Sequence, residues 1–206
     1  MKQVPPRLFA PATLSLGCLI YAALALVALH ILRPDLTPRT NFISNYAVGP
    51  YGWVMTSCFC AMSLGVTLLA IGLISQGMPN LLARIVVALL LIAGVGLLGA
   101  AIFPTDLPGA PYTRAGDIHE KSFLINVSSL LLATVAFALG YSRDSRWCPH
   151  TRVLAMLSVA TCLAFIVQFL TLHKGAPYGL ANRLFALTLL TWLTFVAFGM
   201  RAITSR

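Results

Sequence analysis

Six long stretches without Asp, Glu, Lys or Arg constrain the fold of this chain more than any other feature. They are residues 8–32, 40–83, 85–105, 122–142, 153–173 and 184–200. A helix crosses the hydrocarbon core of a bilayer with about 20 apolar residues, so each stretch is long enough to span a membrane. Lipid offers the backbone no hydrogen-bond partners, whereas a helix satisfies its own backbone locally. Charged residues make up 9% of the chain, far below the roughly one quarter of a soluble domain.

We therefore predict an all-α fold, in which a single domain over residues 1–206 forms a bundle of six transmembrane helices. The predicted spans are 11–32, 51–75, 82–103, 118–141, 152–173 and 180–202. The apolar part of the first span is too long for a signal peptide, which favours a retained helix. In the third span, Gly96 and Ala100 form a pair of small residues that allows close helix approach, and we expect it to serve packing within the bundle.

The basic residues predict the orientation of the bundle, because six spans place both termini on one side of the membrane. The side of the termini holds Lys2, Arg7, Arg84, Arg143, Arg146, Arg152, Arg201 and Arg206, and the other side holds Arg33, Arg39, Arg114, Lys121, Lys174 and Arg183. Lys and Arg are enriched on the cytoplasmic side of membrane proteins. We therefore expect a multi-pass protein of the cell membrane with both termini in the cytoplasm.

The net charge of +9 does not indicate nucleic-acid binding. The basic residues lie at predicted helix ends, where such residues anchor helices at the membrane surface. The chain has no basic run with interleaved aromatic residues, which nucleic-acid binding favours. Membrane lipids are therefore the expected partners.

Polar residues gather in the three connectors that are predicted to face away from the cytoplasm. These connectors and the adjoining helix ends hold most of the carboxylates and histidines of the chain, namely Asp35, Asp106, Asp117, Glu120, His30, His119 and His173. His119, Ser122 and Asn126 share one helix face, because they are spaced i, i+3 and i+7. Polar groups inside a membrane turn towards the bundle interior. We expect a polar pocket that opens to this side and is floored by Asn126 and Gln168.

Each of these polar residues also has a simpler structural explanation. Asp106 follows Pro104 and suits a turn, and Asp117 suits the N-cap of the fourth span. Asn126 and Gln168 could bond neighbouring helices, and Arg183 could anchor a helix end at the interface.

Two kinds of chemistry fit the residue types on this side. Asp106, His119 and His173 are suitable ligands for a divalent metal such as zinc, with His30 as a fourth, although the spacing matches no known zinc motif. Ser44, His119 and Asp106 could instead form a hydrolytic triad, although the chain lacks a GxSxG segment. In either case Tyr46, Asn126, Gln168 and Arg183 are the predicted substrate-binding residues.

Four segments occur in order at the predicted helix boundaries: ISNYAVGPYGWVM, FPTDLPG, GDIHEKS and GLANRLFALTLLTW. Over nearly the whole chain they resemble the domain-of-unknown-function 998 family, a group of mostly bacterial six-span membrane proteins. The resemblance implies a six-helix fold, a bacterial plasma membrane and no established activity. By the family pattern the motif residues are Ser44, Gly49, Pro50, Gly52, Asp106, His119 and Arg183. This chain carries Asn45 where family members often have an acidic residue, which bears on whether a family site is active here.

Three functions remain open on this evidence. The first is a metal-assisted membrane hydrolase that acts on a lipid or another amphiphile. The second is a small-molecule binding, sensing or transport protein, although the chain shows no clear repeat of the kind that transporters contain. The third is a structural membrane subunit, in which Asp106 and His119 would pair to hold a connector.

Overall fold

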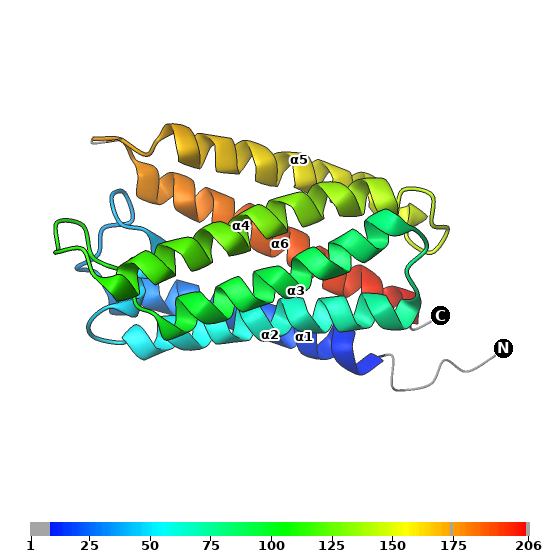
Figure 1. Ribbon diagram of the computed structural model, residues 1–206, viewed down its shortest axis with the longest axis horizontal. Helices are drawn as coiled ribbons and strands as arrows, with labels where there is room; N and C mark the ends of the chain where they lie inside the picture. The colour runs from blue at the N-terminus through cyan, green and yellow to red at the C-terminus, as the bar shows by residue number, and fades with distance from the viewer. Residues whose placement is uncertain (1–8, 174, 205–206) are drawn as a thin grey trace.

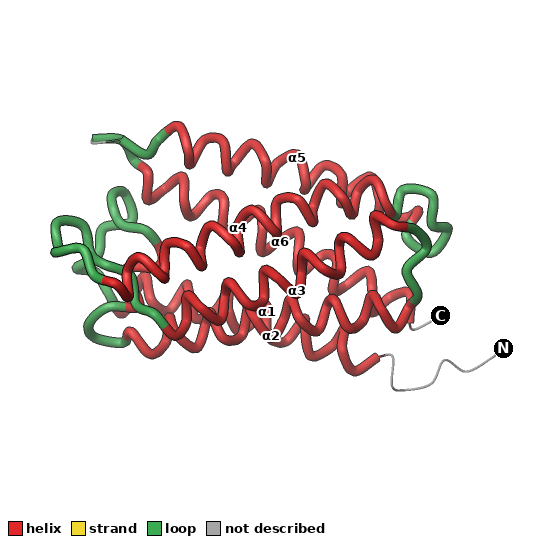
Figure 2. The backbone as a smooth tube through the Cα atoms, viewed as in Figure 1, coloured by secondary structure: helices red, strands yellow, loops and turns green. Residues whose placement is uncertain are grey.

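The computed structural model describes residues 9–173 and 175–204, and within them the chain is helical and contains no strand (Figures 1 and 2). The α-helices are α1 (Phe9–Leu32), α2 (Gly52–Gln76), α3 (Leu81–Ile102), α4 (Arg114–Gly140), α5 (Cys148–Leu170) and α6 (Tyr178–Thr204), and a short 3-10 helix, η2 (Ile43–Ala47), precedes α2. All six α-helices are long and apolar enough to cross a membrane, which confirms the predicted six-span fold.

The helices run side by side along the long axis of the molecule (Figure 1). Three connectors, residues 33–51, 103–113 and 171–177, lie at one end, which we call the connector face. The connectors 77–80 and 141–147 lie at the other end, where α1 begins and α6 ends. The predicted anchors Lys2, Arg7, Lys174 and Arg206 lie outside the described residues.

The core of the bundle is apolar along most of its length. Leu69 of α2, Leu90 of α3, Leu130 of α4 and Trp192 of α6 are fully buried in one cluster. Burial of large apolar side chains does not by itself drive helices together in lipid, where close packing contributes more. The fit between neighbouring helices therefore decides the arrangement.

Helices α3 and α4 fit together through the glycines of α3. A Cβ atom at Gly96 would lie 2.8 Å from the backbone nitrogen of Asn126 and 2.8 Å from the carbonyl oxygen of Ser122. A side chain at Gly99 would likewise overlap with the hydroxyl of Ser122. The small residues of the third span therefore pack against α4 within the bundle, as predicted.

Replacing Gly96 with alanine should destabilise the bundle by about 1–3 kcal/mol, because the added methyl group has no room against the α4 backbone. Gly17→Ala in α1 is the matched control, since nothing lies within 4 Å of a Cβ at Gly17. Thermal unfolding of both variants in detergent micelles measures the difference. Equal stability of the two variants would contradict the close α3–α4 contact.

Candidate functional site

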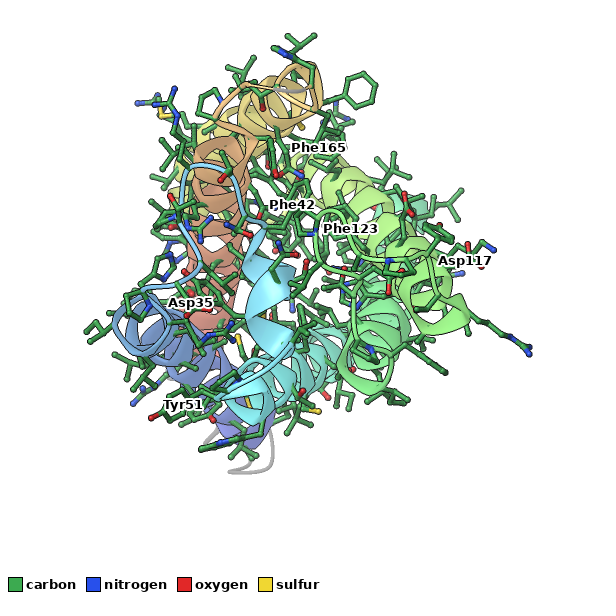
Figure 3. The ribbon with its side chains drawn as sticks, turned by 90° about the vertical axis from the view of Figure 1, so that its left-hand side faces the viewer. Asp35, Phe42, Tyr51, Asp117, Phe123 and Phe165 are labelled. Atoms are coloured by element: carbon green, nitrogen blue, oxygen red, sulfur yellow. The ribbon has the colours of Figure 1, made fainter. Side chains whose placement is uncertain are left out.

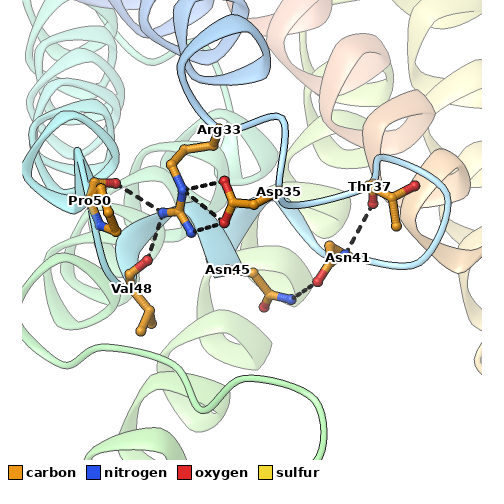
Figure 4. A network of polar contacts seen from close by, with 7 residues as sticks. All are labelled: Arg33, Asp35, Thr37, Asn41, Asn45, Val48 and Pro50. Carbon is orange, nitrogen blue, oxygen red and sulfur yellow. Dashed lines mark hydrogen bonds and ion pairs between the residues drawn. The ribbon is translucent and has the colours of Figure 1, made fainter.

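Arg33 holds the first connector of the connector face (Figure 4). Its side chain is only 5% exposed. The Nε and Nη2 groups donate to the carboxylate of Asp35 at 2.7–3.2 Å, and Nη1 donates to the carbonyl oxygens of Val48 at 2.7 Å and Pro50 at 2.9 Å. The hydrogen bond from Arg33 lowers the pKa of Asp35 below its usual range. A planar guanidinium suits this combination, because it donates in several fixed directions at once.

The segment that Arg33 holds turns sharply into α2. Gly49 has a φ angle of +83° and Tyr51, the N-cap of α2, has a φ angle of +59°. Both angles lie in the left-handed region, which glycine adopts freely and tyrosine adopts rarely. At Gly52 a side chain would overlap with the carbonyl group of Ala47. The Gly-Pro-Tyr-Gly segment is therefore built for this turn.

Arg183 of α6 is the second arginine that joins several groups of the connector face. Its Nε donates to Nε2 of His30 at 2.7 Å, and its Nη2 donates to the hydroxyl of Tyr46 at 3.1 Å. Nη1 reaches three carbonyl oxygens, those of Pro38, Asn41 and Gly179, at 2.7–3.1 Å. The predicted substrate-binding pair Arg183 and Tyr46 is thus brought together, and all three guanidinium nitrogens already donate to groups within the protein.

The contact with Arg183 fixes the tautomer of His30. An arginine only donates hydrogen bonds, so Nε2 of His30 must accept. Nδ1 then carries the proton and donates to the carbonyl oxygen of Leu26 at 2.6 Å. The lone pair of His30 that a metal would need is used by Arg183 in this arrangement.

Amides link η2 to helices α5 and α6. Asn182 accepts a hydrogen bond from the backbone nitrogen of Ile43 at 2.9 Å and donates to Gln168 at 3.3 Å. Asn45, which is 1% exposed, donates to Asn41 at 3.1 Å (Figure 4). Gln168 therefore bonds a neighbouring helix, and the Asn45 side chain stabilises the connector.

Asp106 organises the start of α4. Its two carboxylate oxygens accept from the backbone nitrogen and the hydroxyl of Thr113, each at 2.8 Å. The Thr113 hydroxyl in turn accepts from the backbone nitrogen of Gly116 at 3.0 Å and caps the helix. This cap starts α4 at Arg114, four residues before the predicted boundary. Asp117, the N-cap suggested by the sequence, instead lies in the first turn and pairs with Lys121.

His119 lies one turn further into α4 and is 4% exposed. Nδ1 lies 2.7 Å from the carbonyl oxygen of Phe103 at the end of α3, and because a carbonyl only accepts, Nδ1 is the donor. The imidazole ring meets Phe59 of α2 edge to face, with 5.9 Å between ring centroids. In the neutral ring Nε2 is then an acceptor.

The predicted face of α4 is buried along its length. Ser122 and Asn126 are 9% and 8% exposed, and Ser129 continues the face with 6%. Asn126 lies twelve residues beyond Arg114, about 18 Å of helix rise, whereas Gln168 lies in the last turn of α5. The two amides predicted to floor one pocket therefore occupy different depths along their helices.

A shallow pocket of about 440 Å³, open over much of its surface, lies between the first and second connectors of this face. It is lined by Leu36, Thr40, Asn41, Leu107, Pro108 and Tyr178. Asn41 is positioned by Arg183, and the Tyr178 ring packs on Phe42 with 4.9 Å between centroids. The lining combines apolar side chains with uncharged polar groups.

The residues predicted for catalysis lie on this face but are not hydrogen-bonded to one another. Ser44 is half-buried in η2, and no hydrogen bond or ion pair joins Ser44, Asp106 and His119. Among the described residues, no group of three or more His, Cys, Asp or Glu side chains is placed to hold a metal. His173 lies in the α5–α6 connector, where its carbonyl accepts from the backbone nitrogen of Ala176.

Sequence reasoning missed three residues that matter here. Arg33 holds the first connector by hydrogen bonds, Thr113 holds the second, and Thr40 lines the pocket. A signal for Arg33 was present, because an arginine directly after a transmembrane span and two residues before an aspartate favours a local ion pair. Nothing in the sequence indicated the other two roles.

Six membrane-crossing helices with a polar, well-bonded connector face define a multi-pass helical membrane protein. The chain belongs to the family described as "Protein of unknown function (DUF998)", whose profile matches residues 15–199. No curated protein and no solved structure matches the chain.

Arg33→Lys should lower the free energy of unfolding by about 2–4 kcal/mol, because an ammonium group cannot serve Asp35 and two carbonyl oxygens together. Arg39→Lys is the control, since Arg39 lies exposed on the same connector and should change stability by less than about 0.5 kcal/mol. Unfolding in detergent by titration with SDS gives both values. Equal effects would show that Arg33 does not clamp the connector.

The Arg33–Asp35 pair also predicts a dependence of stability on pH. The pKa of Asp35 is lowered in the folded protein, so its contribution is present above the unfolded pKa of about 3.9 and is lost as the pH falls through the folded pKa. The melting temperature of Asp35→Asn should therefore lie below that of the wild type at pH 6 and approach it on acidification. A difference that stays constant down to pH 2.5 would contradict this linkage.

Proposed function

We propose that this protein is a binding protein for a small amphiphile, which it takes up at the connector face. The observation that carries the proposal is the pocket between the first and second connectors. It lies where the helices end, at the depth at which amphipathic groups collect at a membrane surface. Leu36 and Leu107 offer apolar contact, while Thr40, Asn41 and Tyr178 offer uncharged hydrogen-bonding groups.

The arrangement of α4 and α5 supports a ligand with an apolar tail. The two helices approach each other at the opposite end of the bundle and diverge towards the connector face (Figures 1 and 3). Phe42, Phe123 and Phe165 lie between them in the view of Figure 3, and each is half-buried. An acyl chain that extends from the pocket into the lipid would pass aromatic side chains on this path.

The metal-assisted hydrolase is the alternative, and the geometry favours binding over it. A hydrolase of this kind would use Ser44, Asp106 and His119 together, or Asp106, His119 and His173 around a zinc ion. Asp106 already accepts two hydrogen bonds from Thr113, and His119 already donates to Phe103. Asp106 would have to leave Thr113 before it could serve a reaction, and no hydrogen bond joins His119 to Asp106 or Ser44.

We further propose that the connector face is extracytoplasmic and that both termini lie in the cytoplasm of a bacterial cell. The support is the distribution of basic residues, with eight on the side of the termini and six on the other. Under this orientation the amphiphile enters from the outer leaflet of the plasma membrane.

Filling the pocket should abolish binding without unfolding the bundle. Thr40→Trp places a large ring in the pocket, so we expect at least about a tenfold loss of affinity for 1-monooleoylglycerol, measured as a smaller rise in melting temperature across a lipid titration. Thr37→Trp is the matched control, because Thr37 lies exposed on the same connector and outside the pocket lining.

Two results would overturn the proposed function. One is that the wild type shows no stabilisation by the monoacylglycerol. The other is that Thr40→Trp and Thr37→Trp bind it equally well, which would place the ligand elsewhere on the protein.

A further inference from the structure

Asn126 of α4 is a buried amide with no hydrogen bond. Its Oδ1 atom is shielded from solvent and has no partner among the described residues. A buried polar group left without a partner costs about 1–3 kcal/mol, so such groups are rare in native proteins. The close approach of Gly96 to the Asn126 backbone holds this part of α4 in place.

The neighbouring side chains on the same face of α4 are also polar. Ser122 and Ser129 lie one turn to either side of Asn126, and neither hydroxyl makes a hydrogen bond among the described residues. Other helix hydroxyls of this chain behave differently. Ser128, on the exposed face of α4, donates to the carbonyl oxygen of Leu124 at 2.6 Å, and Ser158 of α5 donates to that of Leu154.

His119 extends this set towards the connector face. Its Nδ1 donates to Phe103, which leaves Nε2 of the neutral ring as an acceptor two turns above Asn126. We call His119, Ser122, Asn126 and Ser129 the α4 polar stripe. Each of the four side chains is more than nine-tenths buried.

The stripe would recognise an uncharged group. No Asp, Glu, Lys or Arg lies between Lys121 and Arg143 of the sequence. Arg183 and Asp106 on the connector face are already hydrogen-bonded within the protein. Glu120 and Lys121, next to the stripe in the sequence, are exposed. Burying an unpaired charge in a membrane is costly. The Oδ1 atom of Asn126 is an unsatisfied acceptor, so its missing partner is a donor.

We infer that the α4 polar stripe binds the hydroxyl or amide N–H of a neutral amphiphile, with Asn126 as the principal acceptor. This inference rests on the proposed function, because it names the chemistry of the ligand that enters from the connector face. The class is therefore a neutral lipid with a free donor group, such as a diacylglycerol. A fully esterified lipid lacks the donor, and an anionic lipid would bring an unpaired charge to the stripe.

The test compares two neutral lipids that differ in a single group. In thermal titrations, 1,2-dioctanoylglycerol carries one free hydroxyl, whereas trioctanoylglycerol carries none. We expect the first to stabilise the wild type at about tenfold lower concentration than the second, since one hydrogen bond is worth about a factor of ten. Asn126→Leu should remove that preference, while Ser128→Ala, on the lipid side of the same helix, should keep it.

Asn126→Leu also tests the stripe without any ligand. Leucine removes an unsatisfied buried amide and has a similar size, so the melting temperature of the free protein should rise by about 2–4 °C. A fall in melting temperature would mean that the amide has a partner in the free bundle and would overturn the inference.

The outcomes separate this inference from the proposed function. If both lipids stabilise the wild type and Asn126→Leu equally while Thr40→Trp abolishes the effect, the proposed function stands and the inference fails. If neither lipid and no monoacylglycerol stabilises the wild type, both fail. A hydroxyl preference that Asn126→Leu retains would place the donor at another residue and would also overturn the inference.

Discussion

The guanidinium of Arg183 is the interaction on which the connector face depends. It joins His30 at the end of α1, Tyr46 of η2 and the carbonyl groups of the first connector to α6. It therefore links the first and the last helix at the connector face. Backbone carbonyl groups that are buried in a connector need hydrogen-bond partners within the protein. Arg33 likewise donates hydrogen bonds to backbone carbonyl oxygens just before α2. Both arginines are therefore engaged in hydrogen bonds within the connector face.

The need to hold the connectors in place explains why carboxylates lie in them. Asp35 completes the shell of Arg33, and Asp106 fixes the threonine that caps α4. Both act on the connectors, and for Asp106 this agrees with the structural explanation offered by the sequence. In the proposed function, ligand binding instead falls to amides, hydroxyls and an imidazole. A site of this kind suits a neutral amphiphile better than bond cleavage, because it has hydrogen-bonding capacity and no paired acid and base.

The sequence predicted the helices well and the site only in part. Charge-free stretches mark membrane spans directly, because a charge in lipid is expensive, and the Gly96 pattern correctly indicated close packing. The i, i+3, i+7 spacing also predicted the buried face of His119, Ser122 and Asn126. Spacing along one helix cannot reveal partners from other segments. Asp106 accepts hydrogen bonds from Thr113 and not from His119 because of the path of the connector. Likewise, the five hydrogen-bond partners of Arg183 come from α1, the first connector and α6.

Photolabelling tests the central claim most directly. A 1,2-dioctanoylglycerol with a diazirine in one acyl chain can be activated on the protein in bilayers, and the labelled residues read by peptide mass spectrometry. A ligand held between the connectors and the α4 stripe should label residues 36–42, 107–108 and 119–126. Labels confined to lipid-exposed positions of α5, such as Met156, Val159 and Leu163, would show that the lipid only coats the bundle and would contradict the account.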